Sequence, residues 1–200
     1  MRWDNLFDDL ESQLEYEITV EDVTLQAEEE RLRLSRLGMR DRIVAAQQAP
    51  QRGSARAVRL MLTGGAVIDA KPVLFGKDWL SADLVSDSIK RQQCVVPLAA
   101  ISALVLERED IPRSLNLAAP EPETGRLADR LGLAFVLRDL CRRRRPVEIL
   151  TGSGAHHGTI DRVGRDHLDL AVHEQGTLRR ESAVTQYRII PFPQIQLVRL

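Results

Sequence analysis

The stretch "RLMLTGG" (residues 59–65) and the stretch "EILTGSG" (residues 148–154) open two copies of one pattern. Twelve residues after the first glycine of each stretch, the chain continues with "GKDWL" from Gly76 and "GRDHL" from Gly164. Matching positions in these stretches lie 88 residues apart. We therefore predict an internal repeat, in which Asp78 and Asp166 lie in equivalent elements.

The ends of the two copies match as well. "VVPLAAISALVL" (residues 95–106) parallels "IIPFPQIQLVRL" (residues 189–200), with two apolar residues, a proline and then an alternating run. Within each copy, short runs of period two are separated by Gly and Pro turns, which is typical of β-strands. Each copy therefore predicts five strands, and "MRDR" and "LRDL" mark a helix before each copy.

The predicted fold class is α+β, with two five-stranded antiparallel small barrels, each preceded by a helix, after an N-terminal helical segment. The predicted domains are an acidic helical segment (1–48), a first barrel (57–110), a Pro-rich linker with a basic helix (111–145), and a second barrel (146–200). The alternation predicts that ten residues are buried: Trp79, Leu80, Val95, Val96, Ile101, Leu168, Leu170, Ile189, Ile190 and Ile195.

The second copy resembles the first motif of Sm-like and SH3-type small barrels. The matching residues are Gly154, Gly158, Ile160, Val163, Asp166, Leu168 and Leu170. This resemblance implies a small barrel over residues 57–110 and 146–200 and, in Sm proteins, RNA binding. The copies depart from the family because Ser81 and Asp169 lie nearest to its base-binding Asn, and Val96-Pro97 and Ile190-Pro191 replace its Arg-Gly pair. The whole chain is also similar to uncharacterised actinobacterial proteins with an acidic "LFDDLE" helix.

Charge is distributed unevenly along the chain. Residues 1–30 hold eleven acidic side chains and Arg2 as the one base, so residues 31–200 carry 27 basic and 18 acidic side chains, a net charge of +9. An acidic segment next to a basic body suggests polyanion binding by the body, docking of a partner by the segment, or masking of one by the other.

Two helices are predicted in the acidic segment. Apolar residues at helical spacing form a stripe on the first helix, and the second is predicted from about Glu21 towards Arg36. The stripe predicts self-association, or packing on the rest of the chain, through Trp3, Leu6, Leu10 and Leu14.

The arginines near residue 142 are the basis of the functional prediction. A run of four arginines ends the basic helix, where it can cap the helix dipole or neutralise phosphates. We predict a non-enzymatic, RNA-binding regulatory protein, with a protein–protein adaptor as the alternative. The predicted nucleic-acid-binding residues are Arg138, Arg142, Arg143, Arg144, Arg145, Arg162 and Arg165.

Catalytic and metal motifs give weaker signals. Adjacent His156 and His157 point to opposite faces of a strand, so they are poorly placed to chelate one metal ion. We predict no cofactor, no metal site and no membrane contact. A cytoplasmic location is expected because no apolar run approaches about 20 residues, and because Cys94 and Cys141 are expected to be reduced.

Overall fold

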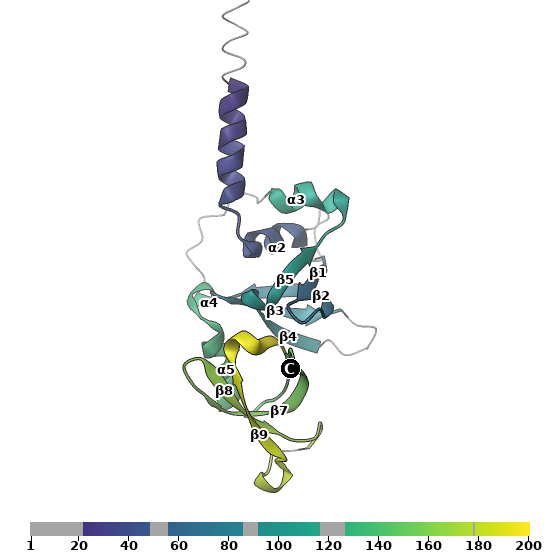
Figure 1. Ribbon diagram of the computed structural model, residues 1–200, viewed down its shortest axis with the longest axis vertical. Helices are drawn as coiled ribbons and strands as arrows, with labels where there is room; N and C mark the ends of the chain where they lie inside the picture. Colours follow the sequence, from purple (N-terminus) through teal and green to yellow (C-terminus); the bar gives the residue numbers. More distant parts are fainter. Residues whose placement is uncertain (1–21, 49–55, 86–91, 117–126, 178) are drawn as a thin grey trace, which may run out of the picture. The chain divides into compact units, whose positions relative to one another are not determined.

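The computed structural model describes residues 22–48, 56–85, 92–116, 127–177 and 179–200 (Figure 1). Two compact units are separated at Gly38, one over residues 1–38 and one over residues 39–200. Residues 22–35 of the first unit are helical, which confirms the second predicted helix. The apolar stripe from Trp3 to Leu14 lies outside the described residues.

The second unit contains all ten predicted strands. Its helices are α2 (Met39–Gln47), α3 (Ile111–Leu115), α4 (Leu127–Arg130) and α5 (Leu133–Arg142). Strands of the first half are β1 (Val58–Leu62), β2 (Val67–Phe75), β3 (Trp79–Leu84), β4 (Gln92–Pro97) and β5 (Ile101–Val105). Strands of the second half are β6 (Pro146–Thr151), β7 (Gly154–Val163), β8 (His167–Val172), β9 (Gln186–Pro191) and β10 (Ile195–Arg199).

The 88-residue spacing of the predicted repeat recurs in the register of the strands. A bulge interrupts the β2–β3 pairing between Pro72 and Leu74, and the same bulge lies 88 residues later, between Ile160 and Arg162. Asp78 and Asp166 lie in equivalent bends. The Asp78 carbonyl accepts a hydrogen bond from the N–H of Leu98, which follows Pro97, and the Asp166 carbonyl accepts one from the N–H of Phe192, which follows Pro191. Short 3-10 turns, Leu98–Ala100 and Phe192–Gln194, then precede β5 and β10.

The prediction of two separate barrels is wrong. All ten strands form one open antiparallel sheet in the order β5-β1-β2-β3-β4-β10-β6-β7-β8-β9. Each half has the same internal strand order, and the halves are joined where β4 pairs with β10, Val95 opposite Val198 and Cys94 opposite Arg199. Figure 1 shows β4 beside the C-terminal end of the chain. We call this pairing the central junction.

Side chains cross the central junction into the opposite core. Trp79 and Val95 of the first half are buried with the second half's core, whereas Leu197 of β10 is buried with the first half's core. Neither half thus buries its apolar residues alone, which is the physical reason that the barrels are not separate.

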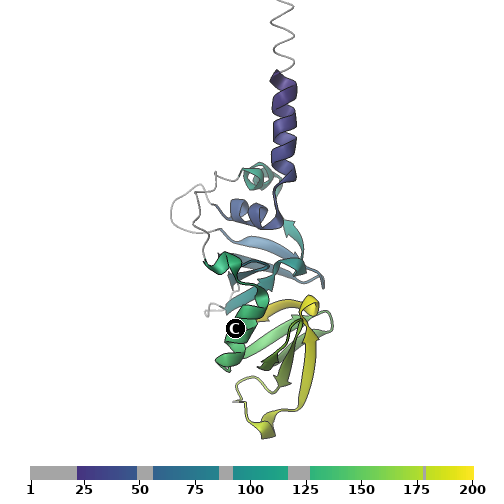
Figure 2. The ribbon, with the colours of Figure 1, turned by 90° about the vertical axis from the view of Figure 1, so that its left-hand side faces the viewer.

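The basic helix predicted before β6 is divided in two. The chain breaks at Gly132 because the bend before β3 contacts it there: the Asp78 carboxylate accepts a hydrogen bond from the Leu133 N–H (2.7 Å), and the Trp79 indole N–H donates to the Leu131 carbonyl (2.9 Å). An acidic side chain at the start of α5 also complements the helix dipole. Helix α5 packs against β7, as Figure 2 shows.

The burial predictions are confirmed for every residue named except Ile189. Val95 of β4 is 3% exposed, as expected for a sheet core. Ile189 occupies the equivalent place in β9, yet its exposed fraction is 70%. Strand β9 is an outermost strand of the sheet, so no strand of the described chain lies on the side where β10 covers β4.

Candidate binding surfaces

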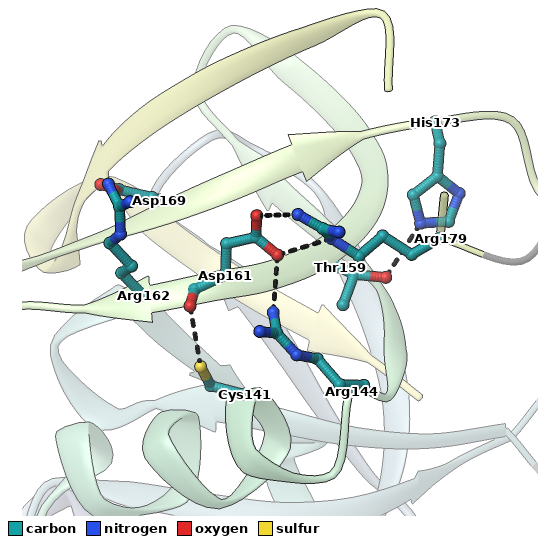
Figure 3. Close-up of polar contacts among 8 residues, drawn as sticks. All are labelled: Cys141, Arg144, Thr159, Asp161, Arg162, Asp169, His173 and Arg179. Carbon is teal, nitrogen blue, oxygen red and sulfur yellow. Dashed lines mark hydrogen bonds and ion pairs between the residues drawn. The ribbon is translucent and has the colours of Figure 1, made fainter. Parts of the chain in front are cut away.

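The arginine run lies at the end of α5 and is held by a carboxylate of the second half. Arg144 has a φ of 51°, the left-handed conformation that commonly ends a helix. Its guanidinium donates to Asp161 of β7 at 2.7 Å, and Arg179 donates to the same carboxylate through two nitrogens (Figure 3). The Cys141 thiol donates to the Asp161 carbonyl at 3.3 Å. Asp161 therefore fixes the end of α5 to the sheet.

Most of the other predicted arginines also have partners within the chain. Arg142 and Arg143 both pair with Asp139 of α5, and together they lower the pKa of that carboxyl group, chiefly through the hydrogen bond from Arg142. Arg162 lies 3.6 Å from Asp169. These carboxylates offset part of the charge that the arginines offer to phosphate groups.

The structure does bring the predicted residues close together. Arg138 of α5 donates to the Gly164 carbonyl at 3.4 Å, beside the bend that contains Arg165. Arg145 is exposed at the end of the same helix. Side chains of the paired arginines stay accessible as well, up to 84% for Arg162. The surface therefore keeps an excess of positive charge, and binding of nucleic acid by it stays a prediction.

A second feature is a depression that occurs once in each half. The larger has a volume of about 400 Å³ and lies beside the central junction. The smaller, of about 210 Å³, lies beside β5. Val147 and His157 line the larger depression. The residues 88 positions earlier, Arg59 and Asp69, line the smaller one. Gln92 of β4 reaches the larger depression from the other half.

His157 is one of several polar residues that line the larger depression. Its two ring nitrogens are buried and have no hydrogen-bond partner among the described residues. Burial lowers the pKa of His157, and the neighbouring His173 lowers it further, while Glu148 opposes them. Glu148 is in turn paired with Arg199. A neutral imidazole can donate one hydrogen bond and accept another.

The third feature is the pair of open sheet edges, β5 and β9. Strand β9 exposes Tyr187 (56%) and Ile189, and β5 exposes Val105 at its end. Arg188, between the two apolar residues of β9, lies 2.9 Å from both ring nitrogens of His156. An outermost strand presents unpaired backbone N–H and C=O groups, so apolar side chains beside it form a template for another strand.

Metal and membrane sites do not emerge from the part of the chain that the structure describes. Within it, no three His, Cys, Asp or Glu side chains are grouped as metal ligands would be. Nor does any of its helices have the length and apolar character needed to cross a bilayer.

No protein-family model, no curated protein and no solved structure matches this chain. No relative therefore assigns an activity to any of these residues, and the likeness to Sm-like and actinobacterial proteins stays a prediction.

Sequence reasoning missed the open edge and the depressions. Alternation places Ile189 on the same face as its buried counterpart, and nothing in the local pattern says which strand is outermost. The 88-residue repeat was the available signal, because two equivalent copies joined in one sheet leave one edge of each copy unpaired.

Proposed function

We propose that this chain is a non-enzymatic, cytoplasmic protein-binding module that takes up an extended segment of another polypeptide as an additional strand on β9. The observation that carries the proposal is the exposure of Ile189 in a strand whose counterpart in the first half is covered. Strand addition of this kind obtains affinity from backbone hydrogen bonds and specificity from alternate side chains.

The surroundings of β9 support this function. Tyr187 and Ile189 are two residues apart, so they project on the same side and offer two apolar contacts in a row. Tyrosine and isoleucine each carry a large apolar area for burial. Soluble chains normally protect such an edge with a charge or a proline. On β9 those protecting residues are Arg188, engaged with His156, and Pro191 at the far end.

A displayed library of random ten-residue peptides tests the proposal. We expect the full chain to select extended peptides with alternating apolar residues, and Ile189→Asp to lose their binding. Val73→Asp is the matched control, because Val73 is equally exposed but lies on β2, which has a neighbouring strand on each side. Peptides that bind Ile189→Asp as well as the original chain would contradict the proposal.

A second candidate function, binding of an RNA backbone, is supported by the exposed positive charge at the end of α5. Contacts of this kind position a nucleic acid and read no sequence. Fluorescence anisotropy with a single-stranded RNA at two salt concentrations tests it. Replacement of Arg142, Arg143 and Arg145 by Ala should weaken binding, and each lost phosphate contact should reduce the log–log salt slope by about 0.7. Equal affinity in the variant would remove this candidate.

A further inference from the structure

The central junction is a contact between two copies of one structural unit. Strand β4 belongs to the first copy and β10 to the second. By the repeat, β9 is the counterpart of β4 and β5 is the counterpart of β10. These two counterparts are the two open edges of the sheet. Within its described residues, one molecule thus carries both sides of an interface that it already forms once within itself, and neither side is paired with another described strand.

We propose that β9 of one molecule pairs with β5 of a second copy of this chain, in the antiparallel register of the central junction. The proposal rests on the proposed function and names the strand that β9 takes up. The register follows from the 94-residue spacing between the ends of the repeats. Val95 opposite Val198 becomes Ile189 opposite Leu104, and Cys94 opposite Arg199 becomes Arg188 opposite Val105.

A backbone hydrogen bond extends the same register. At the central junction the Leu200 N–H donates to the Gln93 carbonyl at 2.9 Å. Its counterpart between two molecules joins the Leu106 N–H to the Tyr187 carbonyl. In this register Ile189 and Leu104 are both apolar, like Val95 and Val198 at the central junction. Arg188 meets the apolar Val105, much as Arg199 meets Cys94.

The smaller depression fits the same register. At the central junction, Gln92 at the start of β4 completes the wall of the larger depression. The equivalent residue of β9 is Gln186, which is exposed. Placed in the same register, Gln186 of the second copy lies over the smaller depression, beside Val105 and the Arg59–Asp69 pair. In the proposed register, Gln186 of a second copy takes the place at the smaller depression that Gln92 takes at the larger one.

The contact between molecules is weaker than the central junction. Trp79, which the first half buries in the second half's core, has His167 as its counterpart. His167 begins β8, and its partly exposed ring is paired with Asp166 at 2.8 Å. The intermolecular contact lacks this aromatic anchor, so association depends on protein concentration. Since β9 and β5 are different surfaces, the assembly is head-to-tail and forms a ring or an open chain.

Disulfide trapping tests the register. Arg188→Cys and Val105→Cys, each in the full chain with Cys141→Ser, are mixed and oxidised. Cys94 stays, because burial raises the pKa of its thiol to about 12 and keeps it unreactive. We expect a disulfide between the two different variants, and little with Val73→Cys in place of Arg188→Cys. A disulfide that joins two Arg188→Cys molecules preferentially would overturn the register, because it requires β9 to pair with β9.

Sedimentation velocity over a range of concentrations tests the assembly. We expect the full chain to associate reversibly, and Ile189→Asp to weaken association at least about tenfold, since it places an unpaired charge at the interface. Association that Ile189→Asp leaves unchanged, or a monomer at all concentrations, would overturn the self-pairing. If the peptide library still binds in the Ile189-dependent way, the proposed function survives that result, and the partner is a different chain.

Discussion

Strands β4 and β9 are the same element in the two halves, but β4 lies in the middle of the sheet and β9 at its edge. Both carry two apolar residues before a proline, and both are paired along one side with the preceding strand. Among the described strands, β10 lies on the other side of β4 and none lies on the other side of β9; Val95 is buried while Ile189 is exposed. The difference shows that the neighbour, and not the local pattern, decides which residues of a repeat become available for binding.

The largest difference in the free energy of unfolding should be seen when the same charge is placed on β4 and, in a second variant, on β9. Val95→Asp puts an unpaired carboxylate into the core at the central junction, so it should lower the free energy of unfolding by roughly 3–5 kcal/mol. Ile189→Asp should change it by less than about 0.5 kcal/mol, as for an ordinary surface substitution. Urea unfolding of both variants makes the comparison. Equal losses would mean that β9 is covered within the molecule.

A cavity in the core of either half should lower the free energy of unfolding by about the same amount. Leu80 and Leu168 are 88 residues apart and fully buried in the two cores. Leu80→Ala and Leu168→Ala should each lower the free energy of unfolding by about 2–5 kcal/mol. Because the cores share side chains across the central junction, we expect one unfolding transition in each variant. Calorimetry that shows two transitions, with only one of them shifted, would break this equivalence.

Removing the charge of Asp161 should lower the melting temperature more than removing that of Asp169, although both are acids of the second half paired with arginine. Asp161 is largely buried and accepts from Arg144 and Arg179, whereas Asp169 pairs at 3.6 Å with an exposed side chain. Asp161→Asn should lower the melting temperature by about 3 °C, and Asp169→Asn by less than about 1 °C. A thermal melt followed by circular dichroism measures both. The reverse order would mean that α5 is not fixed through Asp161.

Mild acid should destabilise the chain through His156 and His157, which lie in the second half. Burial lowers the pKa of His156 and of His157 below the ordinary value of 6.5. The folded state therefore binds fewer protons than the unfolded state, and stability should fall as the pH drops from 7.5 to 6.0. We expect a decrease in melting temperature of up to about 2 °C, which the double change to Gln abolishes. An undiminished decrease in that variant would assign the effect to other groups.

All ten strands could be predicted from the sequence, because each depends on local alternation and on the glycines and prolines that interrupt it. The equivalence of Asp78 and Asp166 followed from the 88-residue spacing. These features need no knowledge of distant contacts.

The pairing of strands across the halves could not be predicted in the same way. Alternation predicts the same burial for Val95 and Ile189. Their burial differs because β4 pairs with the distant strand β10. The break at Gly132 has a similar origin, since an acid 54 residues earlier accepts the hydrogen bond that starts α5. The arginine run was found from composition, but its partner Asp161 is 17 residues from Arg144 and is visible only in the folded chain.

Amide hydrogen exchange of β4 and β9 across a range of protein concentrations tests the central claim most directly. At high dilution, amides of β4 should be protected on both sides of the strand, while β9 keeps an unprotected side. As concentration rises, protection of β9 and of β5 should increase together, and that of β4 should not change. Equal protection of β4 and β9 at high dilution, or protection of β9 that is independent of concentration, would contradict the account.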